Sequence, residues 1–272
     1  MSEKDLGGYC VKIFFLSPAS GTQHKVVRKL KYPYILINYM TKNNKPPPCA
    51  RILFIDCGGF PSSFIHGGYT TSDEEYLKYV KKVNATMFAL RDYPCKPQIL
   101  EKYKITAKDQ INRTFENHIK LLELMDKLNV FSRPIPVIQG WKLEDYLYCL
   151  DLFKEHGLIF DYIAIGSLCR RAATKTIRKI ILTLRKELPK WIRIHGFGVK
   201  LDVLKDKATW EAVYSVDSSA WDLWARIDTL KQGTNRIRKT IEILQKYLQK
   251  LQKLRKSFEK QSQITDFVTN VT

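Results

Sequence analysis

The chain has 272 residues, enough for one large α/β domain or two small ones, and its 44% hydrophobic content supports a full core. A net charge of +19 favours a polyanionic partner, nucleic acid before a membrane surface, although a basic proteome or a need for solubility would also produce it. Six scattered cysteines without a CxxC pair argue against a structural zinc site and a disulfide framework. No apolar run approaches the roughly 18 residues of a membrane span, so we expect a soluble, cytoplasmic protein.

Strands and helices alternate along most of the chain. Apolar segments at 11–16 and 34–39 are expected strands, and three consecutive prolines mark a loop at 43–48. The further expected strands are 52–55, 85–90, 135–139, 161–165, 192–195 and 212–216, and the expected helices are 73–83, 107–128, 143–156, 170–188 and 200–209. This alternation predicts right-handed βαβ units and a parallel sheet.

Several helix boundaries have local signals. Ser72 precedes three acidic residues and is a typical N-cap, and Thr106 stands before a long amphipathic segment. Gly157 follows the expected helix 143–156, where a C-terminal glycine is common.

The expected elements favour an α/β fold of the TIM type, a (β/α)8 barrel. Counted from 34–39 there are seven strands, so the eighth is expected to be short or to lie near 228–234, and the barrel to be incomplete otherwise. An open doubly wound sheet is less favoured, because no GxGxxG follows the first strand and the sequence has no P-loop. We divide the chain into N-terminal strands and a proline-rich loop (1–50), a barrel (51–234) and a basic C-terminal helix with a tail (235–272).

The segment 235–260 predicts a strongly basic helix. An apolar stripe runs along it, made of Ile237, Ile241, Leu244, Leu248, Leu251 and Phe258. One interpretation is a helix packed on the barrel with its charged face in solvent. A second is that the basic face binds a phosphate backbone through Arg238, Lys246, Lys250, Lys253, Lys256 and Lys260. A third is a coiled-coil homodimer, since the stripe spans about three heptads.

Polar residues and glycines follow the carboxyl ends of the expected strands. In chain order these ends are Asp56-Cys57-Gly58-Gly59-Phe60, Arg91-Asp92-Tyr93, Gln139-Gly140, Gly166-Ser167, His195-Gly196-Phe197-Gly198 and Asp217-Ser218-Ser219. In a parallel barrel these ends meet at the rim that carries active sites. An Asp-Gly turn that merely ends a strand is the alternative for Asp56 alone, but three aspartates, a glutamine and several glycines on one rim indicate a functional site.

Three carboxylates without a metal-ligand pattern suggest chemistry at an acetal-type carbon. One would attack the anomeric carbon and a second would handle a proton, with an oxocarbenium-like transition state between. The third would pair with the N–H groups of a purine edge. A glycine-backed pocket near Phe60 and Tyr93 would suit a flat base turned out of a nucleic acid. The residues therefore predict glycosyl chemistry that acts on a nucleotide or a related substrate.

The strand-end motifs resemble those of the tRNA-guanine transglycosylases, barrel enzymes that exchange a guanine in RNA for a 7-deazapurine. Asp56-Cys57-Gly58-Gly59-Phe60 is similar to the family's Asp-Ser-Gly-Gly-Phe, with Cys for Ser. The other similar segments are Asp92-Tyr93-Pro94, Gln139-Gly140, Ile165-Gly166, His195-Gly196-Phe197-Gly198-Val199 and Asp217-Ser218-Ser219-Ala220. Six motifs in order cover roughly residues 50 to 226.

The resemblance implies roles for these residues. Asp217 would be the nucleophile that forms a covalent intermediate at C1′ of the ribose, and Asp56 would accept a proton from the incoming base. The substrate-binding residues would be Gly58, Gly59, Phe60, Asp92, Gln139 and Gly166, with Asp92, Gln139 and Gly166 reading the base and Phe60 stacking near it. The implied partners are tRNA and a free guanine or 7-deazaguanine base.

Three departures from the family pattern bear on the substrate. The family's zinc site of three cysteines and a histidine is absent, since no cysteine follows Cys169, so no cofactor is expected. Ser167 stands where the family has a second glycine, and the chain is short, with a basic helix in place of the zinc subdomain. The principal expectation is guanine exchange in RNA. The same chemistry on DNA and a catalytically inactive nucleic-acid-binding barrel are the alternatives.

Overall fold

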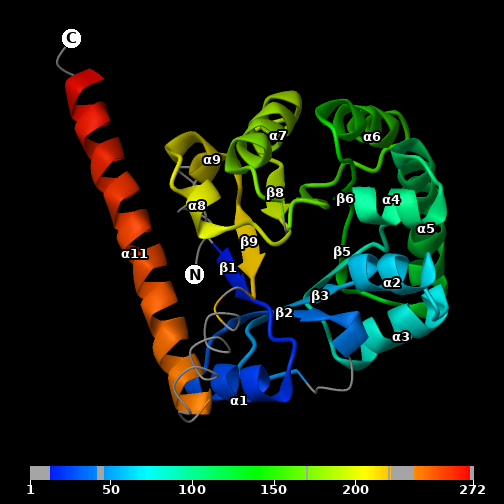
Figure 1. The fold of residues 1–272 in the computed structure, drawn as a ribbon, viewed down its shortest axis with the longest axis horizontal. Helices are drawn as coiled ribbons and strands as arrows, with labels where there is room; N and C mark the ends of the chain where they lie inside the picture. Colours follow the sequence, from blue (N-terminus) through cyan, green and yellow to red (C-terminus); the bar gives the residue numbers. More distant parts are fainter. Residues whose placement is uncertain (1–12, 42–45, 170, 220, 222–235, 270–272) are drawn as a thin grey trace.

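The computed structural model of the chain describes residues 13–41, 46–169, 171–219, 221 and 236–269. All of its strand pairs are parallel, in the order β5-β4-β3-β2-β1-β9-β8-β7-β6. The strands are β1 (Ile13–Leu16), β2 (Tyr34–Asn38), β3 (Ile52–Asp56), β4 (Met87–Ala89), β5 (Arg133–Ile135), β6 (Val137–Ile138), β7 (Tyr162–Ile165), β8 (Arg193–Gly196) and β9 (Ser215–Ser218). Helices surround them, and the predicted TIM-type barrel is confirmed (Figure 1).

β5 and β6 are two halves of one barrel strand, separated by Pro136 alone. β5 pairs with β4 on one side, and β6 pairs with β7 on the other. Proline has no N–H to donate, which breaks the ladder locally, but the Pro136 carbonyl accepts a hydrogen bond from the Ala164 N–H at 2.8 Å. The nine strand segments therefore occupy eight barrel positions, and the ring of hydrogen-bonded strands continues through this segment.

The eighth barrel position belongs to β1, near the start of the chain. β1 pairs with β2 and with β9, in a register that places Phe15 beside Asp217. The prediction counted barrel strands from 34–39 and was wrong to leave out the expected strand at 11–16. The range 228–234, where an eighth strand was expected, lies outside the described residues. β1 and β2, both within residues 1–50, are barrel strands in their own right.

The helices between the strands follow the predicted rhythm with additions. They are α1 (Gly21–Leu30), α2 (Gly59–His66), α3 (Asp73–Lys82), α4 (Pro97–Tyr103), α5 (Ala107–Leu128), α6 (Leu143–Glu155), α7 (Thr174–Glu187), α8 (Leu201–Leu204) and α9 (Lys207–Ala212), with a 3₁₀ turn η2 (Tyr39–Thr41) after β2. The expected helix at 200–209 is divided into α8 and α9. Three further helices, α1, α2 and α4, had no counterpart among the predicted ones.

The local signals at the helix ends act as predicted. Ser72 and Thr106 each accept a hydrogen bond from the backbone N–H three residues on, and Glu75 and Asp109 close the two capping boxes. Gly157, just after α6, has a φ of 69°, the left-handed conformation that commonly ends a helix. These caps bound α3, α5 and α6 close to the predicted residues.

The C-terminal helix α11 (Arg236–Thr269) lies along the outside of the barrel beside α1 (Figure 1). Leu244 is fully buried, the Tyr247 ring packs on Phe14 with centroids 5.6 Å apart, and the Phe258 ring packs on Trp210 at the same separation. The apolar stripe is thus covered by the barrel, as the first interpretation of this helix predicted. Its use in a coiled coil would require the helix to leave this position.

Candidate active site

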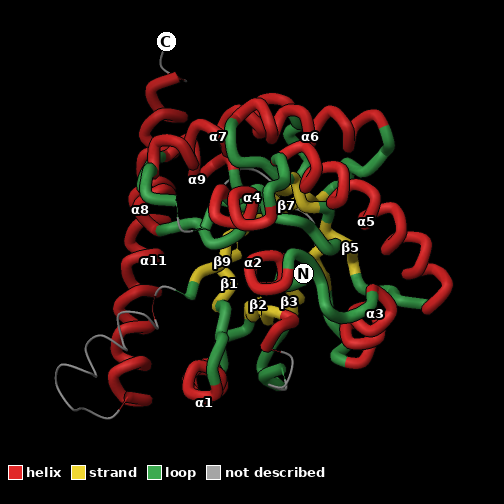
Figure 2. Tube along the Cα trace, turned by 45° about the vertical axis from the view of Figure 1, so that its right-hand side comes forward, coloured by secondary structure: helices red, strands yellow, loops and turns green. Residues whose placement is uncertain are grey.

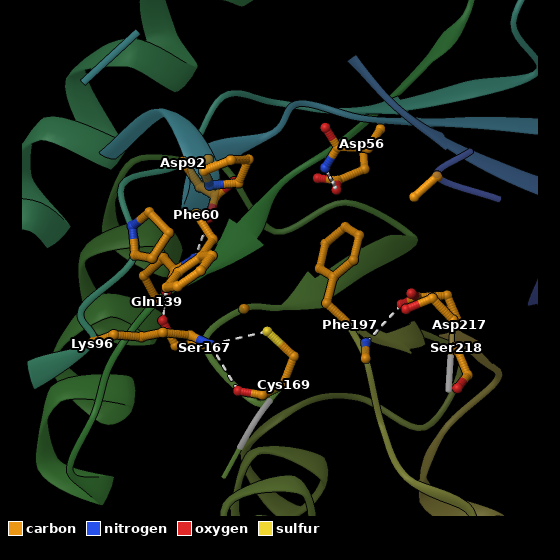
Figure 3. A pocket seen from close by; sticks show the side chains of 18 of the residues that line it. Asp56, Phe60, Asp92, Lys96, Gln139, Ser167, Cys169, Phe197, Asp217 and Ser218 are labelled. Carbon is orange, nitrogen blue, oxygen red and sulfur yellow. Dashed lines mark hydrogen bonds between the residues drawn. The ribbon is translucent and has the colours of Figure 1, made fainter. Parts of the chain in front are cut away.

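A pocket of about 690 Å³ opens at the carboxyl ends of the strands. The residues that line it include Asp56 at the end of β3, Asp92 after β4, Gln139 after β6, Gly166 after β7 and Asp217 in β9. Parallel strands deliver these side chains to one rim because all eight barrel positions point the same way. In Figure 3, Asp92, Phe60 and Gln139 gather on one side, Asp217 and Ser218 face them from the other, and Phe197 lies between.

Asp56 is held by hydrogen bonds and surrounded by negative charge. The Asn38 side-chain amide donates to one carboxylate oxygen at 2.6 Å, and the Gly58 N–H donates to the other at 3.2 Å. Burial raises the pKa of Asp56 to about 7, and the nearby carboxylates of Asp92 and Asp217 add to the rise. A carboxyl group with this pKa exchanges a proton readily near neutral pH.

Asp92 is buried and accepts hydrogen bonds on both oxygens. The Cys57 thiol donates to Oδ1 at 2.8 Å, and the Gln139 side-chain amide donates to Oδ2. Burial raises the pKa of Asp92, while these two hydrogen bonds oppose the rise. A carboxylate has about four acceptor positions, so Asp92 retains capacity for the N–H groups of a purine edge.

Two glycines allow the close packing of this side of the pocket. A Cβ on Gly59, at the start of α2, would lie 2.7 Å from the Asp92 carbonyl oxygen. A Cβ on Gly166 would lie 2.1 Å from Nε2 of Gln139 and would displace the amide from Asp92. Glycine at both positions therefore maintains the geometry of the Asp92–Gln139 pair.

Ser167, where the resembled family has glycine, adopts a left-handed backbone with a φ of 54°. That conformation is unfavourable for a residue with a Cβ. Its hydroxyl donates to Oε1 of Gln139 at 2.7 Å and accepts from the Cys95 N–H at 3.2 Å. The serine thus fixes the orientation of the Gln139 amide, and these hydrogen bonds offset the backbone strain.

Asp217 lies opposite, in β9, and is 9% exposed. The Gly198 N–H donates to its Oδ1 at 2.7 Å, and Nε2 of His195 lies 3.4 Å from the same oxygen. The His195 ring is positioned from its other nitrogen, which is 2.7 Å from the Ser215 hydroxyl. These two contacts fix the position of the carboxyl group that the resemblance implies to be the nucleophile.

An aromatic and cationic wall completes the pocket. Phe60, in the first turn of α2, has the Lys96 ammonium 4.5 Å from its ring centroid. Lys96 is 3% exposed, and its ammonium donates to the Cys169 carbonyl at 2.7 Å and lies 3.0 Å from the Cys169 sulfur. This wall places an aromatic ring and a buried positive charge at the pocket, two groups that commonly contact a nucleobase.

The structure brings seven of the eight predicted catalytic and base-binding residues to the pocket wall: Asp56, Gly59, Phe60, Asp92, Gln139, Gly166 and Asp217. The eighth, Gly58, is the N-cap residue of α2 and has a left-handed backbone with a φ of 77°. The predicted nucleic-acid-binding residues Arg238, Lys246, Lys250 and Lys253 lie on α11, outside the described lining of this pocket.

Sequence reasoning missed several wall residues. Asn38 ends β2 and would have been found by the same strand-end rule, had it been applied to the strand at 34–39. Phe197 lies within a motif that was recognised but was given no role. Lys96 and Cys169 carry no local signal, because their approach across the pocket depends on how two loops pack.

No group of three or more His, Cys, Asp or Glu side chains in the described part of the chain is arranged to hold a metal ion. The zinc ligands of the resembled family likewise have no sequence counterpart, because no cysteine follows Cys169. We therefore derive no step of the chemistry from a metal. Among the helices described, none combines the length and apolar character needed to cross a membrane.

Comparison with protein families decides the relationship. The model of the family DpdA, described as DeoxyPurine in DNA protein A, matches residues 38–269, which is most of the chain. The chain belongs to the DpdA family. The match includes every strand from β3 onwards and all the predicted site residues.

A curated relative supports the same grouping. The tRNA-guanine(15) transglycosylase of Methanococcus aeolicus is 25% identical over 179 residues, which are 65% of this chain and 27% of the relative. The chain thus matches about a quarter of that protein's length. The prediction that the chain is related to the tRNA-guanine transglycosylases is confirmed by the two comparisons together.

Proposed function

We propose that this member of the DpdA family exchanges a guanine in DNA for a free 7-deazapurine base. The observation that carries the proposal is the pocket itself, in which Asp217 faces Asp56 and the Asp92–Gln139 pair across a space lined by Phe60. Three carboxylates with different surroundings suit three different tasks: nucleophilic attack, proton transfer and base reading.

The proposed reaction has two steps, and Asp56 donates a proton in the first and accepts one in the second. An oxygen of Asp217 attacks C1′ of the target nucleotide, and the C1′–N9 bond breaks through an oxocarbenium-like transition state. Asp56, in its protonated form, gives its proton to the departing guanine. Asp56 then accepts the N9 proton of the incoming base, whose nitrogen attacks C1′ and displaces Asp217.

Base reading falls to the opposite wall. Asp92 would accept hydrogen bonds from donor N–H groups of the purine, and the backbone at Gly166 lies close enough to contact the base because it has no side chain. Phe60 would stack on the ring, with Lys96 beside it. A base in a duplex is too deep in the stack to reach such a pocket, so the target must be turned out.

DNA is proposed as the substrate because the matching family is described by a deoxypurine in DNA. RNA, the principal expectation from the sequence motifs, is the second candidate, since the Methanococcus aeolicus relative is named for tRNA. In either case the net charge of +19 suits a phosphate backbone. We propose that no metal cofactor takes part, and that the reaction takes place in the cytoplasm.

The proposal is tested by incubating the protein with labelled guanine and either plasmid DNA or bulk tRNA. We expect label to enter DNA, and Asp217→Ala to lower incorporation by at least about a thousandfold, because the covalent intermediate cannot form. Mass spectrometry of the wild-type protein, mixed with DNA and no incoming base and then denatured, should detect a covalent protein–DNA adduct that Asp217→Ala does not form. Incorporation by Asp217→Ala at the wild-type rate would refute the assignment, and label in tRNA alone would favour the second candidate.

A further inference from the structure

Three exposed apolar side chains lie on α2, whose first turn lines the pocket, and on the adjoining turn η2. Phe64 and Ile65, in the last turn of α2, are 40% and 56% exposed, and Met40, in the adjoining turn η2, is 42% exposed. The Ser62 hydroxyl lies 3.4 Å from the Met40 sulfur, so the two segments are in contact. We call Met40, Phe64 and Ile65 the apolar tip. Exposed apolar groups gathered in one place commonly mark a binding surface.

The apolar tip is continuous with the base pocket. Phe60 lines the pocket, and its ring stacks on Phe64 with centroids 5.7 Å apart and planes 15° from parallel. One helical turn therefore carries an aromatic surface from the pocket to the outside of the protein. Figure 2 shows α2 at the centre of the view beside α4, with the strands behind it.

The backbone of the apolar tip is firmly held although its side chains are exposed. The Phe64 carbonyl accepts from the Lys102 ammonium at 2.7 Å and from the Tyr103 hydroxyl at 3.3 Å, both on α4. The next turn is fixed by Arg113 of α5, whose guanidinium donates to the Gly67 carbonyl at 3.4 Å. A rigid apolar projection loses little conformational entropy when it enters a partner.

The surroundings of the apolar tip favour a polyanion over an apolar protein partner. The Lys102 ammonium lies 5.1 Å from the centroid of the Phe64 ring, and the Arg113 guanidinium lies 4.0 Å from that of Tyr93. Lys104 is exposed at the end of α4, with Glu101 as an acidic neighbour. Aromatic rings interleaved with cations are characteristic of surfaces that bind nucleic acid.

We propose that the apolar tip inserts into the base stack of duplex DNA and occupies the space vacated by the target guanine as it turns into the pocket. This inference rests on the proposed function and extends it to duplex DNA as the form of the substrate. Apolar side chains that enter a base step offset part of the cost of unstacking it. Phe64 and Ile65 would serve this role, because they lie one helical turn from the ring that receives the base.

The test compares native plasmid DNA with the same plasmid after heat denaturation and rapid cooling. Incorporation of labelled guanine is measured on both, and permanganate reactivity of unstacked thymines is measured on the native duplex. Phe64→Ala and Ile65→Ala are each expected to lower incorporation into native DNA by roughly tenfold, because each variant removes apolar surface that would offset the cost of unstacking the base step. Incorporation into denatured DNA should stay within about twofold, because an unpaired base needs no extrusion.

Two further comparisons distinguish the loss of the apolar tip from other effects of substitution. Ile65→Ala leaves the Phe60–Phe64 stack in place, so its effect cannot arise from a disturbed Phe60. Phe131→Ala removes an apolar side chain that is 93% exposed just before β5, at the opposite end of the barrel, and should change neither substrate. Equal losses on native and denatured DNA, or no loss on either, would overturn the proposal.

The two proposals fail in distinguishable ways. If wild-type protein incorporates guanine into denatured DNA or RNA only, base exchange stands and insertion into duplex DNA is wrong. If no nucleic acid takes up label, the proposed function fails. Permanganate reactivity then still decides the role of the tip: thymines made reactive by wild-type protein, but not by Ile65→Ala, support insertion, and equal reactivity overturns it.

Discussion

At the scale of single residues, the two catalytic candidates are the same amino acid in different surroundings. Asp56 is half-buried beside two other carboxylates, and the loss of solvent around it, together with their charges, raises its pKa to about 7. Asp217 instead has the Gly198 N–H 2.7 Å from Oδ1 and the His195 ring close to the same oxygen. Environments of this kind separate a proton-transfer group from a nucleophile on one rim.

The raised pKa of Asp56 predicts a pH dependence for base exchange. In the proposed reaction, uptake of the incoming base requires the ionised form of Asp56, so kcat/KM for free guanine should fall below about pH 7, approaching tenfold per pH unit. The measurement is the initial rate of label incorporation at subsaturating guanine. The residual rate of Asp56→Asn should not fall as the pH drops below about 7. If the same fall persists in the variant, the ionisation belongs to another group.

The same pKa shift predicts a stability effect. The folded-state pKa lies above the unfolded value, so the folded protein holds the extra proton, and Asp56 reduces stability as pH rises through about 4 to 7. Asp56→Asn should therefore raise the free energy of unfolding by about 1–3 kcal/mol at about pH 8 and change it little at about pH 4. Urea denaturation at the two pH values measures this, and a destabilised variant at about pH 8 would contradict it.

At the scale of elements, one face of α11 packs against the barrel and the other is exposed to solvent. Thr240 and Leu244 are fully buried against the rest of the chain, whereas Arg238, Lys250 and Lys253 are exposed. Removal of the whole helix would therefore unfold part of the barrel as well as remove charge. Point substitutions on the exposed face are the cleaner test of nucleic-acid binding.

We expect substitution of Arg238, Lys246, Lys250 and Lys253 by Gln to weaken DNA binding and to flatten its salt dependence. If all four contact phosphates, the slope of log K against log salt should become less negative by up to about 3 to 4. Fluorescence anisotropy at several salt concentrations provides the measurement. The matched control replaces four exposed lysines elsewhere, Lys82, Lys127, Lys186 and Lys190, by Gln. Equal slopes for the two variants would rule out α11 as a specific binding face.

At the scale of the whole molecule, the barrel depends on a contact between the first and the last of the described strands. β1 lies between β2 and β9, and its residues Phe14, Phe15 and Leu16 are at most 4% exposed. Burial of such side chains stabilises by about 1.5–3 kcal/mol each. The contribution of β1 is therefore comparable to the total stability of a typical domain.

Deletion of residues 1–17 is expected to abolish cooperative unfolding, because it removes β1 and exposes the edges of β2 and β9. The position of Asp217, paired with Phe15 in register, should be lost as well. Differential scanning calorimetry of this variant measures the effect, with deletion of residues 1–10 as the control that retains all of β1. A normal transition in the shorter variant would show that β1 is dispensable.

The sequence by itself determined most of the strands, several of the helices and the strand-end residues of the pocket wall. Periodicity and turn residues are local, so the strand ends at Asp56, Gln139 and Gly166 and the caps at Ser72 and Thr106 were visible before any fold was known. A barrel then requires all carboxyl ends to share one rim, which brings distant motifs together without further information.

Tertiary structure alone decided the features that depend on what packs against what. The place of β1 as the eighth strand follows from pairing across about 200 residues, which no local pattern encodes. Likewise, the contact of Lys96 with Cys169, the pKa of Asp56 and the exposure of Phe64 depend on neighbours supplied by other segments. Burial and electrostatics are properties of the assembled environment, because both depend on which groups displace water around a side chain.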